Sequence, residues 1–242
     1  MTRIKNDMKA LVLEPKIGPL DIEKIKKKST MKSIIAINAS PRNTWNTSSL
    51  VQEAARGAQD AGAKVEIIHL YKLENLKGCM SCFGCKLPQN LGKCIYQDDL
   101  APILEKIRHA DGLILGTPNY LGETSAAFRA FYERLIFQYL TYKKEISSYN
   151  DHQIPVLFIM TSNAPENYYE TLVENYKQTF NHFIGPTQVI KCGNTLQVHN
   201  YDLYDWTIFD PQQKKEHHET VFPKEKQNAY LLGKKMVKDS WK

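Results

Sequence analysis

The chain has 242 residues, of which 42% are hydrophobic, 24% charged and 10% aromatic. A chain of this length and composition can bury one large core, so these values exclude a disordered, collagen-like or disulfide-stapled protein. The formal net charge is +6, but residues 1–32 hold nine Lys and Arg against four acids, which leaves about +1 for the rest. We therefore expect a basic N-terminal extension over residues 1–32, one domain over residues 33–242, and no nucleic-acid partner.

The extension offers little else. Ala10–Leu13 is predicted to form one strand, beside a short helix, and the charge run Lys24–Lys28 fits a solvated helix face better than a nucleic-acid or membrane patch. No stretch reaches the roughly 18 apolar residues that a membrane span needs, and the N-terminus lacks the apolar core of a signal peptide. The sequence predicts a cytoplasmic protein with no membrane partner, whose five cysteines are reduced.

From Ser33 onward, apolar runs of strand length alternate with longer stretches of helical period, which is typical of βαβ units. Five strands are predicted, at Ser33–Ala39, Lys64–Leu70, Gly112–Thr117, Pro155–Thr161 and near Gln188–Lys191. Helices are predicted at Thr47–Ala61, Asp98–Ala110, Thr124–Tyr142, Glu166–Phe183 and, packing back on the sheet, Lys224–Val237. The predicted fold is an α/β doubly wound five-stranded parallel sheet with helices on both faces.

A polar loop follows the first predicted strand and leads straight into a helix. In such sheets, ligands bind outside the carboxyl ends of the strands, and a helix N-terminus favours a phosphate group. Ser40, Arg42, Asn46, Thr47 and Ser48 can bind its oxygens. The loop contains no glycine, which excludes a Walker loop and a dinucleotide fingerprint. The alternative is that Thr47 or Ser48 only caps the helix.

Four cysteines follow the second predicted strand with the spacing C-x2-C-x2-C-x8-C: Cys79, Cys82, Cys85 and Cys94. Three thiolates from one loop can converge on one cluster and a fourth can complete four-sulfur coordination, which suits a [4Fe-4S] centre. Tetrahedral zinc needs the same four donors. An empty or redox-active thiol group is the third interpretation.

The other chemically active residues support simpler interpretations. Asp98 and Asp99 fit the first turn of a helix, where the helix dipole stabilises negative charge. Cys192 fits a small buried hydrophobe. His217 and His218 are adjacent, so their side chains point apart, and no other histidines have metal-ligand spacing. The sequence contains no nucleophile elbow and no catalytic triad that spacing supports.

Two later loops lie at the same predicted edge of the sheet. The loop after the third strand offers an aromatic or apolar surface for a flat ring, an amide for its polar edge, and a glycine where the backbone comes close. Its residues are Pro118, Asn119, Tyr120, Leu121 and Gly122. After the fourth strand, Thr161 and Ser162 can reach the edge of the ring or cap the next helix.

These motifs resemble a known family. SPRNTWNTSSL resembles the phosphate loop of the flavodoxin-like NADPH-dependent FMN reductases, and GTPNYLGETSAAFRAFYERL resembles their isoalloxazine loop and the helix behind it. The resemblance runs from about Met31 to Val237. The cysteine motif resembles that of the iron-sulfur flavoproteins, a branch of the same fold, although the last gap of eight residues is longer here.

The resemblance implies an FMN-dependent oxidoreductase that uses NAD(P)H and a small-molecule acceptor or redox partner. The flavin carries the chemistry, so no catalytic side chain is required. FMN would contact the phosphate-loop, ring-loop and third-loop residues named above. One alternative is an iron-sulfur flavoprotein that passes electrons between a [4Fe-4S] cluster and FMN. Another, of a different class, is a zinc- or thiol-bearing binding module on a flavodoxin-like scaffold. Family analogy also implies a homodimer or homotetramer, with residues Leu140–Gln153 at the interface.

Overall fold

The computed structural model describes residues 31–238 and 241. The chain divides into two units between Met31 and Lys32. The strand and short helix expected in the N-terminal extension fall outside the described residues. The sheet and its helices all belong to the second unit.

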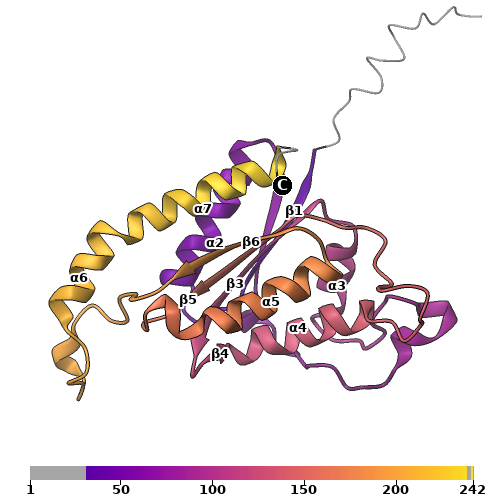
Figure 1. Ribbon diagram of the computed structural model, residues 1–242, viewed down its shortest axis with the longest axis horizontal. Helices are drawn as coiled ribbons and strands as arrows, with labels where there is room; N and C mark the ends of the chain where they lie inside the picture. Colours follow the sequence, from indigo (N-terminus) through magenta and orange to yellow (C-terminus); the bar gives the residue numbers. More distant parts are fainter. Residues whose placement is uncertain (1–30, 239–240, 242) are drawn as a thin grey trace, which may run out of the picture. The chain divides into compact units, whose positions relative to one another are not determined.

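Five strands form the parallel sheet that the alternating pattern predicts. They are β1 (Ser33–Asn38), β2 (Lys64–His69), β3 (Gly112–Tyr120), β5 (Val156–Thr161) and β6 (Thr187–Cys192), in the order β2-β1-β3-β5-β6 (Figure 1). Each neighbouring pair runs parallel. The strand order reverses at β1, which lies between β2 and β3. In a doubly wound sheet this reversal opens a crevice at the carboxyl ends of the strands, where ligands bind.

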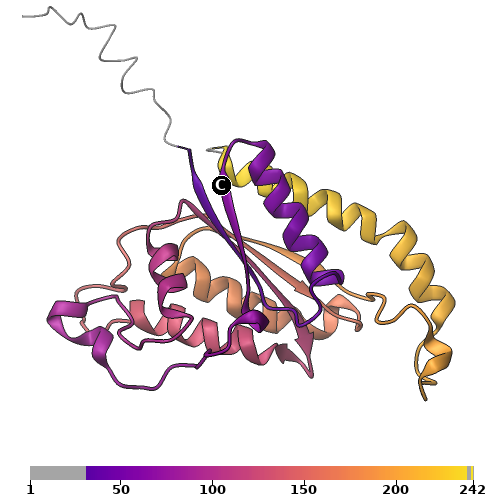
Figure 2. The same ribbon diagram turned by 180° about the vertical axis from the view of Figure 1, so that it is seen from behind.

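Helices cover both faces of the sheet, as predicted (Figure 2). On one face lie α2 (Asn46–Asp60) and α7 (Phe222–Val237), and on the other α3 (Ala101–Arg108), α4 (Ala126–Tyr139) and α5 (Glu170–Phe183). Each face of the sheet has its own hydrophobic core, and alternate residues of β1 contribute to each. Ile34 and Ala36 face α2, whereas Ile35 and Ile37 face the α3–α4–α5 layer. None of the helices in the described part of the chain is long and apolar enough to cross a membrane.

A short strand at the end of β3 was not predicted. β4 (Glu123–Thr124) pairs antiparallel with β3 through Asn119 and Tyr120. The connecting residues, Leu121 and Gly122, have φ angles of 55° and 79°, as a two-residue hairpin turn with right-handed twist requires. The predicted ring loop is therefore the end of a strand followed by a tight turn.

The contact between α2 and α7 depends on two glycines. A Cβ added to Gly57 would lie 1.9 Å from the Tyr230 carbonyl oxygen, and one added to Gly233 would lie 1.9 Å from the Ala54 carbonyl oxygen. The two helix backbones thus touch without intervening side chains. α6 (Pro211–Thr220), which the sequence analysis did not predict, leads into α7. The packing of α7 on α2 holds α2, the helix that follows the polar loop, against the sheet.

The cysteine-bearing segment between β2 and α3 is fastened by a buried ion pair. Arg134 Nη1, on α4, lies 2.7 and 2.6 Å from the two Asp98 carboxylate oxygens, and Arg134 Nη2 lies 2.8 Å from the Tyr96 carbonyl. The two charged side chains are only 1% and 4% exposed. Asp98 Oδ1 also accepts hydrogen bonds from the backbone N–H groups of Leu100 and Ala101. The prediction that Asp98 and Asp99 lie in the first turn of a helix is wrong, because α3 begins only at Ala101. Asp98 precedes the helix and carries an ion pair that was not predicted, and Asp99 accepts from the backbone N–H groups of Glu74 and Asn75.

Candidate cofactor site

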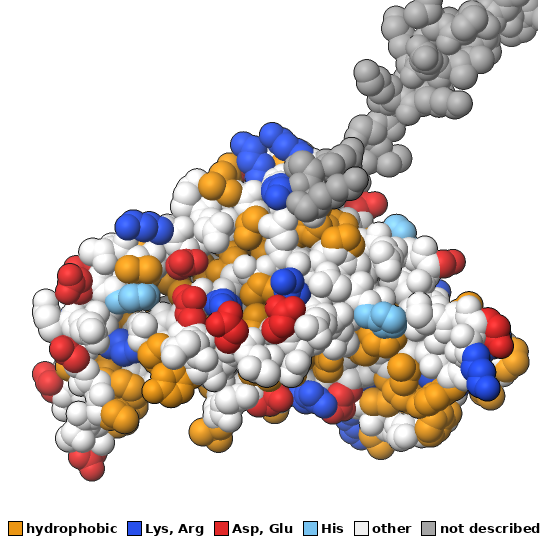
Figure 3. Space-filling view, viewed as in Figure 1, with side chains coloured by type: hydrophobic (Ala, Val, Ile, Leu, Met, Phe, Trp, Pro, Cys, Tyr) orange, Lys and Arg blue, Asp and Glu red, His pale blue; other side chains and the backbone are white. Residues whose placement is uncertain are grey.

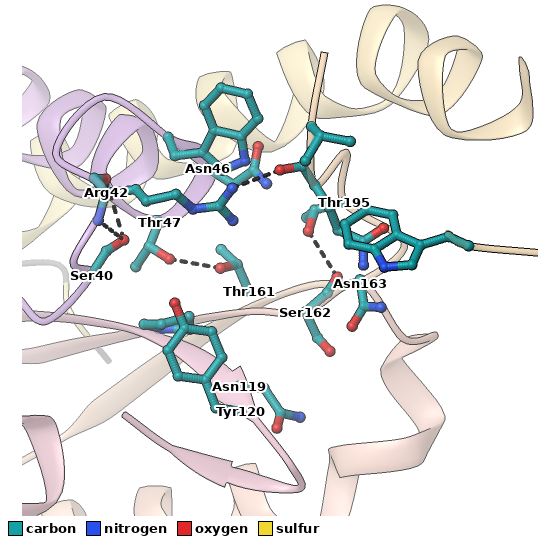
Figure 4. A pocket seen from close by; sticks show the side chains of 15 residues that line it. Ser40, Arg42, Asn46, Thr47, Asn119, Tyr120, Thr161, Ser162, Asn163 and Thr195 are labelled. Atoms are coloured by element: carbon teal, nitrogen blue, oxygen red, sulfur yellow. Dashed lines mark hydrogen bonds between the residues drawn. The ribbon is translucent and has the colours of Figure 1, made fainter. Parts of the chain in front are cut away.

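The ends of β3 and β5 and the segments that follow β1, β5 and β6 meet at the carboxyl edge of the sheet and enclose a pocket of about 300 Å³ (Figure 4). The structure brings most of the predicted contact residues to this one pocket. They are Ser40, Arg42, Asn46, Thr47, Pro118, Asn119, Tyr120, Thr161 and Ser162. The pocket size lies at the lower end of the range for small-molecule sites.

The phosphate loop presents the N-terminus of α2 to the pocket. α2 begins after Trp45 without any side-chain cap, so the alternative that Thr47 or Ser48 caps it is wrong. The first backbone N–H groups of an uncapped helix are free to bind an anion. Thr47 Oγ1 lies 2.7 Å from Thr161 Oγ1, which joins the first and third loops across the pocket floor (Figure 4).

Three predicted residues do not line the pocket. Ser48 is buried behind the loop, where its Oγ donates to the Asn43 carbonyl and accepts from Asn38 Nδ2 at 3.0 Å. Its hydroxyl thus holds the loop in shape. Leu121 and Gly122 form the turn between β3 and β4, and the Leu121 side chain is fully exposed. The hairpin moves both residues beyond the pocket edge.

A wall of the pocket that the sequence analysis missed comes from the segment after β6. Thr195, Gln197, Val198 and Trp206 line the pocket beside the predicted residues. Carbonyl oxygens of this segment accept hydrogen bonds from the phosphate loop: Arg42 Nη1 to Gln197 at 2.6 Å, and Asn46 Nδ2 to Leu196 at 2.7 Å. These bonds hold both side chains at the pocket mouth. The amide- and aromatic-rich stretch before α6 was the only signal for this wall in the sequence.

Tyr120 gives the pocket a neutral aromatic wall. Burial raises the pKa of its phenol, against the opposing effect of the nearby Arg42. The side chain points into the pocket, with Asn119 beside it (Figure 4). A neutral ring and amide groups opposite an anion-binding helix terminus fit a flat heterocycle that carries a phosphate.

The four predicted cysteines lie around a second, smaller pocket. Cys79, Cys82, Cys85 and Cys94 all line it, although their exposure differs: Cys82 is exposed and Cys85 is buried. In the described ranges, no three Cys, His, Asp or Glu side chains are grouped so that they could hold a metal ion. A single zinc ion needs its donors to converge on one point, whereas the irons of a [4Fe-4S] cluster each take a cysteine at a different corner. All four thiols line one pocket, and they are the donor set that either a cluster or a zinc ion takes.

Two side chains of α4, Arg134 and Gln138, complete this cysteine pocket. Burial raises the pKa of the Cys85 thiol, and the neighbouring Lys86 opposes this effect. Burial acts to lower the pKa of Arg134, but Asp98 and Cys94 outweigh it and raise the pKa. The pocket thus contains a cation that stays charged beside the sulfur atoms.

Apolar side chains surround the cysteine pocket. Figure 3 shows them gathered over the C-terminal part of α4 and the neighbouring loops. The exposed members are Met80, Phe83 and Ile95, which line the pocket, and Tyr142, whose ring lies against Phe83. Tyr142 belongs to the stretch predicted to form a subunit interface, and this interface stays a prediction.

Cys192, at the end of β6, is expected to resist thiol reagents. Its side chain is 1% exposed, as predicted, and burial together with Glu225 and Glu166 raises the pKa of the thiol to about 12. Because the thiolate is the reactive form, we expect Cys192→Ala to leave the fast phase of labelling by a disulfide reagent unchanged in the native protein at pH 8. Cys82→Ala, by contrast, should remove one fast-reacting thiol, since Cys82 is exposed. Loss of a fast thiol in Cys192→Ala would contradict the burial of β6.

Comparison with known proteins agrees with this geometry. A family model described as NADPH-dependent FMN reductase matches residues 32–189, which is more than half of the chain. The chain belongs to this family. The resemblance expected from the two loop motifs is thereby confirmed. The matched range holds the cofactor-pocket residues from Ser40 to Asn163 and the four cysteines of the second pocket, but it ends before the wall formed by Thr195, Gln197, Val198 and Trp206.

Curated relatives of this family member are iron-sulfur flavoproteins. One from Methanocaldococcus jannaschii is 39% identical over 101 residues, which cover 42% of this chain and 50% of that protein. One from Archaeoglobus fulgidus is 35% identical over 103 residues, or 42% of this chain and 47% of that protein. The chain thus spans about half the length of the curated relatives it matches.

Solved structures confirm the flavodoxin-like fold of this family member. An NAD(P)H:quinone oxidoreductase from Methanothermobacter marburgensis superimposes with a TM-score of 0.61 at 13% identity, covering 85% of this chain and 98% of that one. An azoreductase from Bacillus anthracis gives a TM-score of 0.60 at 12% identity, covering 85% and 100%. At these identities the likeness concerns the fold alone.

Proposed function

We propose that the protein is an FMN-dependent oxidoreductase that takes electrons from NAD(P)H and passes them to a small-molecule acceptor or a redox partner. The observation that carries the proposal is the pocket at the strand ends, which combines an uncapped helix N-terminus with a neutral aromatic wall. Membership of the FMN reductase family supports it. Bound FMN would supply hydride and single-electron transfer at its ring.

The residues present fit FMN. Arg42, Asn46 and Thr47, with the N–H groups of the first turn of α2, would hold the phosphate. Tyr120 would flank the ring, and Asn119 would face its polar edge. No side chain in this assignment has to exchange a proton, which agrees with the absence of a catalytic triad from the sequence.

The first test is the visible spectrum of the purified chain and its oxidation of NADPH. We expect two resolved flavin bands that leave the protein with acid, and NADPH oxidation that depends on an added quinone or flavin. A colourless protein that binds no added FMN would instead support the zinc- or thiol-bearing module.

Removing the phosphate contacts should weaken FMN binding. In the double variant Arg42→Ala, Thr47→Ala we expect the Kd for FMN to rise at least about 30-fold, because one charge-assisted and one neutral hydrogen bond together contribute about 2 kcal/mol or more. The measurement is FMN fluorescence quenching on titration of the apoprotein.

The matched control for this variant is Arg56→Ala, Thr179→Ala, which removes the same residue types from the exposed surfaces of α2 and α5. It should leave the Kd unchanged. Equal affinity in both double variants would mean that the phosphate binds elsewhere.

A second candidate function is an iron-sulfur flavoprotein, in which a [4Fe-4S] cluster bound by Cys79, Cys82, Cys85 and Cys94 exchanges electrons with FMN. The position of all four cysteines around one pocket favours it, and so do the names of the curated relatives. Four thiolates are the donor set of such clusters. Protein purified without oxygen should then show a broad absorbance that acid destroys, whereas flavin bands alone would indicate a simple reductase.

We also propose a homodimer or homotetramer with residues 140–153 at the interface. Light scattering on the purified chain tests this assembly.

A further inference from the structure

Two side chains from one face of α4 end at the cysteine pocket. Arg134 and Gln138 are four residues apart, so they lie on the same face of the helix. Each is 1% exposed, and both line the pocket beside the four cysteines. Polar groups buried to this degree in a native protein nearly always have hydrogen-bond partners.

Each of these side chains has one buried donor without such a partner. Arg134 uses both Nη atoms on Asp98 and on backbone carbonyls, but its Nε has no acceptor among the described residues. Gln138 Oε1 accepts from the Cys94 backbone N–H at 3.1 Å, while its Nε2 has no acceptor in the same part of the chain. A buried donor left unsatisfied costs about 1–3 kcal/mol, and more when it is charged.

Both donors are held in place by their other bonds. The Asp98 carboxylate fixes the guanidinium of Arg134, and the Cys94 amide fixes the carboxamide of Gln138. Neither can turn to seek another partner without breaking a buried bond. The pocket is therefore arranged for an occupant that accepts hydrogen bonds. The other atoms of the pocket that could bind this occupant are the sulfur atoms of the four cysteines.

We propose that Arg134 Nε and Gln138 Nε2 donate hydrogen bonds to sulfur atoms of an iron-sulfur cluster held by Cys79, Cys82, Cys85 and Cys94, and thereby raise its reduction potential. The inference rests on the second candidate function. Reduction adds negative charge to the cluster and its sulfurs, so donors and a nearby cation stabilise the reduced state more than the oxidised one. Because both donors lie on α4, this helix would influence the potential of a cluster whose ligands all lie on the segment between β2 and α3.

The test uses the full chain, reconstituted without oxygen with ferrous iron and sulfide. Gln138→Glu keeps an oxygen to accept from the Cys94 N–H but replaces the donor by an acceptor. We expect it to bind the same amount of iron as the wild type. Its midpoint potential, measured by dithionite titration, should fall by about 59 mV, which is a tenfold change in the one-electron equilibrium.

Gln97→Glu is the matched control. Gln97 lies three residues beyond Cys94 on the same segment, is exposed and does not line the cysteine pocket. Its replacement by Glu introduces the same charge and removes only an exposed donor to the Ile95 carbonyl, outside the pocket. The one-electron reduction equilibrium of the cluster should change less than twofold in this variant, so its midpoint potential should stay close to that of the wild type. Gln138→Met removes the donor without adding a charge and should lower the potential in the same direction, which keeps the test valid if Gln138→Glu fails to fold.

The outcomes separate the inference from the function beneath it. Equal potentials in the wild type, Gln138→Glu and Gln138→Met would overturn the inference, since the donors would then face bound water. Failure of the wild type to bind iron would overturn the second candidate function, and the inference with it. Equal midpoint potentials are seen only when the variants are compared with the wild type, whereas failure to bind iron is seen in the wild type itself.

Discussion

Replacing Asp98 by Ala is expected to lower the free energy of unfolding by about 3–5 kcal/mol, because it leaves the Arg134 guanidinium buried without its partner. Both side chains are almost fully buried, and the Asp98 carboxylate also accepts from the backbone N–H groups of Lys77, Leu100 and Ala101. The change therefore releases the cysteine segment and the start of α3 at once. Urea unfolding followed by circular dichroism measures the loss.

Glu66→Ala is the control for Asp98→Ala. Glu66 pairs with Lys106 at 2.6 Å, but both side chains are nearly half exposed. Pairs of this kind contribute about 0–1 kcal/mol, so the control should change the unfolding midpoint little. If Asp98→Ala cost no more than Glu66→Ala, water would have to reach Arg134, and the ion pair would not fasten the segment.

Replacing Gly233 by Ala should destabilise the protein by about 2–3 kcal/mol, although Ala is the better helix former. In an open helix the same change would stabilise by about 1 kcal/mol, since Gly carries a larger entropy cost. In α7 the added methyl group would lie 1.9 Å from the Ala54 carbonyl, so α2 and α7 must move apart. Overpacking of this kind costs about 1–3 kcal/mol, and more where a backbone has to shift.

The sign of the change decides this prediction. A higher midpoint of urea unfolding in Gly233→Ala would contradict the close contact between α2 and α7. Leu231→Ala, at an exposed position of the same helix, should change stability by only about 0.5 kcal/mol or less. Because α2 carries the phosphate loop, Gly233→Ala should also weaken FMN binding, whereas Leu231→Ala should not.

The parts of the fold that were predicted are those with a strong local pattern. The five parallel strands and the five predicted helices each have a clear apolar pattern. β4 is only two residues long, which is too short to show any period. α6 was missed because its sequence PQQKKEHHET carries no apolar stripe, although Asp210 caps it and Pro211 begins it. Those two residues are standard helix-start signals that periodicity alone does not weigh.

The site was predicted where topology alone determines it. The carboxyl ends of neighbouring parallel strands meet at one edge, so the loops after β1, β3 and β5 converge whatever their sequence. The wall after β6 depends instead on hydrogen bonds such as Asn46 to Leu196, between residues 150 positions apart. The Arg134–Asp98 pair spans 36 positions and has the same character. No period or motif marks such long-range contacts in a single sequence.

The contact between α2 and α7 has a consequence for synthesis of the protein. α2 is complete at residue 60, but α7 begins only at residue 222. At ribosomal rates of about 5–20 residues per second, α2 and its face of the sheet wait roughly 10–30 s for the helix that covers them. The segment that closes the cofactor pocket also emerges in the last part of this interval. The nascent chain therefore presents an uncovered apolar face to chaperones, and the cofactor pocket is complete only after the segment that follows β6 has been translated, not with the first strands.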